Sequence, residues 1–156
     1  MKTQKSRRLV IDASVVQSAG ESEHPVSSAC RAYLEAILNI CHHAVLTKYI
    51  CDEWNKHMSN YSRKWRRSML AHRKSLDDII PKKINFNTKG LSVADLNAIE
   101  KDLFLIEAAL SADSIIITRD EDLLRRLAKT SQGLELLNSI TWINPVTDGI
   151  IKLERL

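Results

Sequence analysis

The sequence predicts an α/β domain built on a mainly parallel sheet. Short apolar runs alternate along the chain with longer segments whose apolar residues recur at helical spacing. The best-marked strand, residues 114–118, contains three consecutive isoleucines and no polar alternation, as expected for a strand buried on both faces of a parallel sheet. At 156 residues the chain is most simply one domain, long enough to enclose a proper core.

The first half of the chain contains two predicted strands separated by helices. We expect strands at 8–12 and 44–47, a helix opening at Ala13, and helices at about 26–41, 49–61 and 62–78. Apolar stripes at helical spacing mark the last three: Cys30, Leu34, Ile37, Leu38 and Cys41; Ile50, Trp54, Met58 and Tyr61; Trp65, Met69, His72 and Leu76.

In the second half, Pro81 stops the preceding helix, and residues 82–86 alternate as an edge strand would. Ser92 and Asp95 match a capping box, so Asp95 is assigned mainly to helix initiation. We then expect a helix along the stripe Leu96, Ile99, Leu103, Ile106 and Leu110, the strand at 114–118, a helix at 121–130, a turn at Gly133, a strand at 140–143 and a short helix after Val146.

Three aspartates stand where a ligand site would form. Asp12 and Asp120 each follow a predicted strand, and the carboxyl ends of neighbouring parallel strands share one edge of a sheet. Asp102 lies between Ile106 and Ala109 on the helical wheel, inside the face that should be buried. Two alternatives stay open: Asp120 could cap the following helix, and Asp102 could pair with a buried Arg or Lys.

The charge is unevenly distributed. The net charge is +4, whereas residues 63–83 alone carry +6 and the rest of the chain −2. This asymmetry suggests a polyanionic partner, and a solvated basic helix is the alternative. The residues that we expect off the apolar stripe of one helix, available to RNA phosphates, are Arg63, Lys64, Arg66, Arg67, Arg73 and Lys74.

Composition also bears on the compartment. No apolar run approaches the length of a membrane span, and the apolar stretch after the basic N-terminus is too short for a signal peptide, so we expect a cytoplasmic protein with no membrane partner. Cys30, Cys41 and Cys51 are odd in number and lack metal-site spacing, and we expect them reduced and mostly buried.

Several chemistries are excluded. The chain lacks a dinucleotide fingerprint, a Walker A motif, a nucleophile elbow and zinc-protease histidine spacing, and Ser14 stands where a dehalogenase-like phosphatase needs a second Asp. The carboxylates remain: Asp12, Asp102, Asp120 and Glu53, which could also be an edge residue paired with Lys56 or His57. Oxygen ligands suit Mg²⁺ or Mn²⁺, and with a basic surface they favour metal-assisted phosphodiester hydrolysis.

The chain resembles the PIN domain (PilT N-terminus) nucleases. The motifs are Leu9-Val10-Ile11-Asp12-Ala13-Ser14, Glu53 on the helix after the second strand, Lys101-Asp102-Leu103 with Ala108-Ala109-Leu110, and Ile115-Ile116-Ile117-Thr118-Arg119-Asp120. Each motif is short, but the ordered set covers about residues 8–145.

The resemblance implies a single three-layer α/β/α domain over residues 1–156 and a metal-dependent endoribonuclease. It implies that Asp12, Glu53, Asp102 and Asp120 bind one or two Mg²⁺ or Mn²⁺ ions, with Thr118 supporting the site by hydrogen bonding and Asp122 either assisting or favouring the first helical turn. Many proteins of this size look like VapC-type toxins of type II toxin–antitoxin pairs, which implies an RNA substrate, an antitoxin partner and a homodimer. This chain differs from the shorter toxins in its long basic region, residues 54–83. A non-catalytic RNA- or protein-binding module on the same fold is the alternative.

Overall fold

A computed structural model describes residues 5–156 and confirms the predicted fold class. All the strands in this part of the chain belong to one parallel sheet with the order β3-β2-β1-β4-β5. The strands are β1 (Arg8–Ile11), β2 (His43–Val45), β3 (Ser75–Leu76), β4 (Ile115–Ile117) and β5 (Thr141–Ile143).

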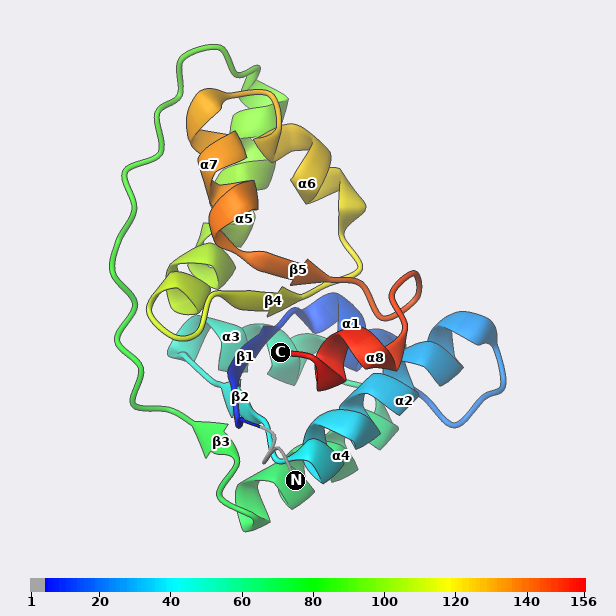
Figure 1. The fold of residues 1–156 in the computed structure, drawn as a ribbon. Coiled ribbons are helices and arrows are strands. Elements are labelled where there is room, and N and C mark those ends of the chain that lie inside the picture. Colours follow the sequence, from blue (N-terminus) through cyan, green and yellow to red (C-terminus); the bar gives the residue numbers. More distant parts are fainter. Residues whose placement is uncertain (1–4) are drawn as a thin grey trace.

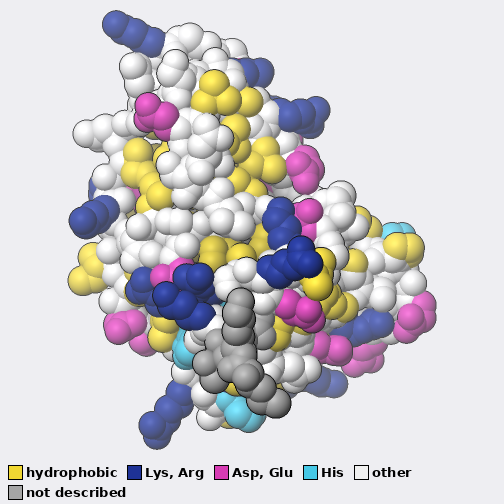
Figure 2. Space-filling model, in the orientation of Figure 1, with side chains coloured by type: hydrophobic (Ala, Val, Ile, Leu, Met, Phe, Trp, Pro, Cys, Tyr) yellow, Lys and Arg dark blue, Asp and Glu magenta, His cyan; other side chains and the backbone are white. Residues whose placement is uncertain are grey.

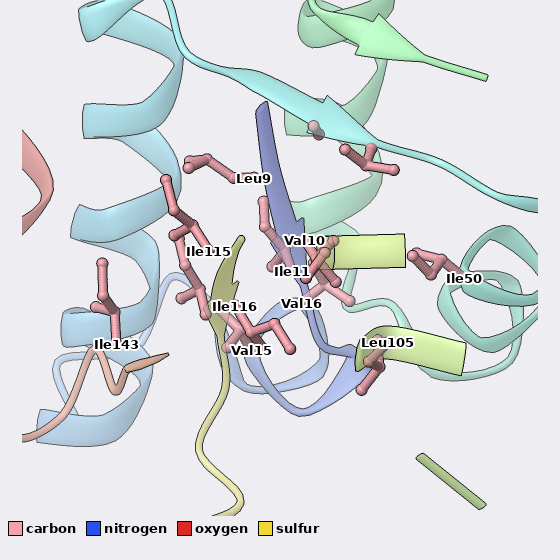
Figure 3. Close-up of a cluster of buried hydrophobic side chains, with 14 of the residues drawn as sticks. Leu9, Val10, Ile11, Val15, Val16, Ile50, Leu105, Ile115, Ile116 and Ile143 are labelled. Carbon is pink, nitrogen blue, oxygen red and sulfur yellow. The ribbon is translucent and has the colours of Figure 1, made fainter. Parts of the chain in front are cut away.

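Helices cover both faces of the sheet, giving three layers (Figure 1). In Figure 3, β1 and β4 lie between α2 on one side and the pair α3 and α5 on the other. The helices are α1 (Ala13–Ser18), α2 (Pro25–Ile40), α3 (Lys48–His57), α4 (Asn60–Ala71), α5 (Val93–Leu110), α6 (Glu121–Leu127), α7 (Ser131–Ser139) and α8 (Ile150–Glu154).

The core is formed by the two central strands and the helices that flank them. Leu9, Val10 and Ile11 of β1 are completely buried, as are Ile116 and Ile117 of β4. They belong to one buried hydrophobic cluster that also includes Val15 and Val16 of α1, Ile50 of α3 and Leu105 of α5 (Figure 3). The apolar run without alternation is therefore explained by burial on both faces.

The chain between β2 and α5 differs from the prediction. Met58 and Ser59 divide the expected helix 49–61, and the Ser59 side chain caps α4 by accepting a hydrogen bond from the Ser62 N–H. The expected helix 62–78 ends at Ala71, because His72 closes it and Arg73 adopts a left-handed conformation with φ 56°. The next residues form the short strand β3, which the sequence analysis missed.

The expected edge strand at 82–86 is not formed. The segment runs outside the sheet towards α5 (Figure 1), and side chains of other elements bind its backbone. The Glu107 carboxylate accepts from the Ile84 N–H at 2.9 Å, and Ser111 Oγ accepts from the Lys82 N–H at 3.0 Å. These hydrogen bonds to distant side chains take the place of the β-ladder that the alternating pattern of residues 82–86 predicted.

Helix α5 begins as predicted, but its buried face is shifted. Ser92 Oγ accepts from the Asp95 N–H, while the Asp95 carboxylate binds Arg126 and Lys129 at 2.7 and 2.8 Å. The hydrogen bond from Lys129 is the main cause of the lowered pKa of Asp95. Within the predicted stripe Ile99 and Ile106 are buried, Leu96 and Leu103 are half-buried, and Leu110 is exposed; Leu105, Ala108 and Ala109 complete the buried face.

The three cysteines differ from one another in burial. Cys30 is buried as expected, whereas Cys51 is half-buried and Cys41 is exposed, and all three are free thiols. Leu153 of α8 is fully buried, so packing continues beyond residue 145. No helix within residues 5–156 is long and apolar enough to cross a membrane.

Gly133, predicted in a turn, lies in the first turn of α7 at its junction with α6. A Cβ atom there would lie 1.8 Å from the Leu127 carbonyl oxygen. Because this oxygen belongs to the backbone, the clash can be relieved only by moving the two helices apart. We predict that Gly133→Ala lowers stability by roughly 2 kcal/mol or more and the melting temperature by about 5 °C. Thermal unfolding followed by circular dichroism measures both.

Gly149→Ala is the matched control, because its Cβ would meet only the flexible Ile151 side chain at 3.8 Å. Equal melting temperatures for the two variants would contradict this account of the α6–α7 junction.

Candidate active site

Asp12 stands directly after β1 and is fixed by its neighbours at the carboxyl edge of the sheet. Its backbone N–H donates to the Ile117 carbonyl at 2.9 Å, which joins the ends of β1 and β4. Its carboxylate oxygen Oδ2 accepts hydrogen bonds from Ser14 Oγ and Thr118 Oγ1, both at 2.8 Å. Both bonds use one oxygen, so Oδ1 is left for another ligand.

Thr118 connects Asp120 to Asp12 by two hydrogen bonds. The Thr118 hydroxyl oxygen accepts from the Asp120 N–H at 3.0 Å while its proton goes to Asp12. Asp120 Oδ1 accepts from the Leu123 N–H at 3.0 Å, so the residue does cap α6. The cap uses one carboxylate oxygen, and the capping interpretation is therefore compatible with a second role at this edge.

Asp102 is half-buried on α5, and its pKa is raised to about 6. Burial is the largest cause, followed by the negative charges of Asp12 and Asp120; Lys101 opposes the shift and Glu53 adds to it. Among the described residues no Lys or Arg forms an ion pair with Asp102, so the buried-pair alternative is not realised. The structure thus places Asp102 within electrostatic reach of the three other predicted acids.

Glu53 occupies α3 at the border of this group. Its carboxylate oxygens lie 3.4 Å from Lys56 Nζ and 3.6 Å from His57 Nε2, the pairing expected of an edge residue. The next residue, Trp54, is buried, and its indole Nε1 donates to the Ile11 carbonyl at 2.9 Å. This bond fastens α3 to the end of β1.

The donor set fits a hard divalent cation chemically, although it is not closed around one. In residues 5–156 no three His, Cys, Asp or Glu side chains are arranged as a metal-binding group. Burial, together with the like charges of Asp12 and Asp120, raises the pKa of Asp102, and a bound cation would stabilise its ionised form. The residues that could hold Mg²⁺ or Mn²⁺ are Asp12, Asp102 and Asp120, with Glu53 once it turns from Lys56.

Of two other residues near this edge, Asp122 lies in the first turn of α6, one of its two expected roles, and Ser14 has a role that was not predicted. Asp122 binds Arg125 and Arg126 at 3.0 and 2.7 Å, so its carboxylate serves α6, and the bond from Arg126 is the main cause of its lowered pKa. Ser14, noted in the sequence only as an excluded motif, binds Asp12 and also accepts from the Arg119 N–H at 3.2 Å. Its position two residues after a strand-end Asp is the signal that could have identified it.

The predicted basic surface is only partly assembled. Arg63, Lys64, Arg66 and Arg67 lie on α4, whereas Arg73 and Lys74 follow its end, so placing all six on one helix was wrong. The Arg66 guanidinium is bound to Asn55 Oδ1 at 2.7 Å and lies over the Trp54 ring, and Lys74 Nζ donates to the Leu38 carbonyl. On the face seen in Figure 2, lysine and arginine side chains are interspersed with acidic ones.

Comparison with known proteins adds no assignment. No protein-family model, no curated protein and no solved structure matches this chain.

The raised pKa of Asp102 generates a pH-dependent prediction. A folded-state pKa near 6, above the unfolded value of 3.8, means that ionising Asp102 destabilises the fold as pH rises from about 4 to 6. Asp102→Asn removes this cost, so without metal it should raise stability above pH 6 by up to about 2 kcal/mol, with no gain below pH 4. Urea unfolding in EDTA from pH 4 to 8 measures the difference.

Glu100→Gln, on the exposed side of the same helix, is the control and should show no such pH-dependent gain. A loss of stability in Asp102→Asn at pH 7 would mean that the carboxylate is a structural partner.

Proposed function

We propose that this chain is a metal-dependent endoribonuclease of the PIN type. The observation that carries the proposal is that Thr118 joins Asp12 and Asp120 by hydrogen bonds at the ends of β1 and β4, while the half-buried Asp102 has a pKa raised by burial and by the charges of these two acids. A folded protein gains no stability from bringing like charges together, so such a cluster is a candidate functional site. The positions of Asp12 and Asp120 directly after or near the ends of β1 and β4 support the proposal, because parallel α/β sheets bind ligands at this edge.

Different residues at that edge would bind the metal ion and orient its ligands. Asp12, Asp102 and Asp120, joined by Glu53, would hold Mg²⁺ or Mn²⁺, which when bound supplies activation of water and neutralisation of charge on the phosphate. Thr118 would orient Asp12 by donating to Oδ2, leaving Oδ1 for the ion. Ser14 shares that task and links the Asp12 carboxylate to the backbone of Arg119.

RNA is the substrate, and the exposed basic residues of α4 are proposed to bind its backbone. We further propose a cytoplasmic toxin of a type II pair, held inactive by a cognate antitoxin and acting as a homodimer. The sequence resemblance supports these statements, and the long basic region 54–83 sets the chain apart from the shorter toxins.

A second candidate is a non-catalytic RNA- or protein-binding module on the same fold. The observation that favours it is the present state of Glu53, whose carboxylate lies against Lys56 and His57, together with the absence of a closed three-ligand group among residues 5–156. A nuclease must turn Glu53 away from these partners when the ion binds, whereas a binding module need not.

Cleavage of a single-stranded RNA in Mg²⁺ or Mn²⁺ tests the proposal. We expect fragments with either metal and none in EDTA, and we expect Asp12→Asn or Asp102→Asn to lower the rate at least about 100-fold, because each removes a charged metal ligand. Asp122→Asn should keep most of the activity, because its carboxylate binds Arg125 and Arg126. RNA binding without metal-dependent cleavage would favour the binding module.

The basic residues of α4 give a separate prediction. Arg63 and Arg67 are exposed, and each phosphate contact contributes about −0.7 to the slope of log affinity against log salt for a single strand. We predict that Arg63→Ala with Arg67→Ala flattens this slope by about one unit and leaves the rate at saturating RNA unchanged. Fluorescence anisotropy at 50–300 mM salt measures it, and an unchanged slope would mean a merely solvated helix.

A further inference from the structure

A groove of about 850 Å³ opens beside the acidic cluster, between α3, α5 and the segment 77–84. Glu53 belongs to both features: it lines the groove and acts electrostatically on Asp102. Lys101 and Leu103, which flank Asp102 on α5, also line the groove, so it borders the candidate active site. Its lining includes the apolar residues Ile79, Ile80, Pro81 and Leu103.

Two aromatic rings form part of the groove wall. The ring centroids of Tyr49 on α3 and Phe104 on α5 lie 6.2 Å apart, with their planes tilted by 44°. Tyr49 is 60% exposed although its ring is mostly apolar, so a large part of the ring has no protein covering. Tyr49 and Glu53 are four residues apart on one helix, which places the ring one turn from the carboxylate on the same face.

The charges around the groove are nearly balanced. Lys48, Lys56, Lys83 and Lys101 face the acidic residues Asp52, Glu53, Asp77, Glu100 and Glu107. Two of these acids already have partners within the chain, since Glu107 binds the Ile84 N–H and Glu53 lies against Lys56. Long-range attraction of a polyanion is therefore weak here, and a ligand of this groove must gain most of its affinity from the aromatic rings. The lysines can bind individual phosphates.

We propose that this groove is a base-binding subsite, in which Tyr49 and Phe104 stack on an unpaired base of an RNA strand whose backbone passes the acidic cluster. The inference rests on the proposed function for the identity of the strand. Bases stack on aromatic rings in a way that tolerates sequence, and the rings can reach only bases that are not paired in a helix. Tyr49 and Phe104 are positioning residues: they would set which phosphate lies beside Asp102 without taking part in its hydrolysis.

A protein segment is the competing occupant of an apolar groove. The structure favours a nucleic acid because the groove shares Glu53 with the acidic cluster, presents two tilted rings and offers lysines. The groove is also bordered by the exposed Ile80, which would pack against the flat face of a base as readily as against a side chain.

The test uses the full chain and a single-stranded 12-nucleotide RNA carrying 2-aminopurine, whose fluorescence falls when the base stacks. Binding is measured in EDTA, where no cleavage is expected, and cleavage is measured separately in Mg²⁺. We expect Tyr49→Leu and Phe104→Leu each to weaken binding about 5- to 100-fold and to abolish the quenching. Tyr49→Phe, which keeps the ring, should restore both, and the salt slope should stay that of the wild type.

Leu134→Ala on α7 is the control for loss of an exposed apolar side chain outside the groove and outside α4, and it should bind as the wild type does. Wild-type cleavage together with undiminished binding and quenching in both leucine variants overturns the subsite and leaves the nuclease proposal standing. No wild-type cleavage, with quenching that depends on Tyr49 and Phe104, supports the subsite and overturns the nuclease. No RNA binding by the wild type overturns the subsite and leaves the groove to a protein segment.

Discussion

The parallel pairing of β1 with β4 is the contact on which the rest of the structure depends. Val10 and Ile11 lie in register with Ile116 and Ile117, and all four are fully buried. Because the strands are parallel and adjacent, the polar residues that follow them emerge at one edge. The hydrogen bond between Thr118 and Asp12 then follows from the register. Burial of apolar strands thus determines the position of the polar site.

Helix α5 cannot move away from this edge, because the face that carries Asp102 also packs into the core. Leu105, Ile106, Ala108 and Ala109 are buried, and their packing holds Asp102 half-buried and within electrostatic reach of Asp12 and Asp120. The fold therefore bears an electrostatic cost at one position and offsets it by apolar packing along the same helix. Such an arrangement is typical of sites whose geometry is set by a ligand and not by stability alone.

The predictions were accurate where short-range pattern decides structure and wrong where distant contacts do. The isoleucines of β4 and the capping Ser92 carry their own signals. By contrast, the end of α4 depends on Arg73 in a left-handed conformation that no local residue type requires, and β3 exists because its two residues pair with β2. At the site, the strand-end acids could be predicted from position, and the contacts of Asp122 with residues three and four positions later on the same helix could also have been predicted from spacing.

The groove and the acidic cluster share one set of supports. Tyr49 and Glu53 are carried by α3, and Phe104 and Asp102 by α5, so the distance between ring and carboxylate is fixed within each helix. The indole of Trp54 ties α3 to β1 at the residue before Asp12. A shift of either helix would therefore move an acid and a ring together. A base held by the rings and a phosphate held at the acids would keep a constant separation, which is the condition for selecting one phosphodiester bond along a flexible strand.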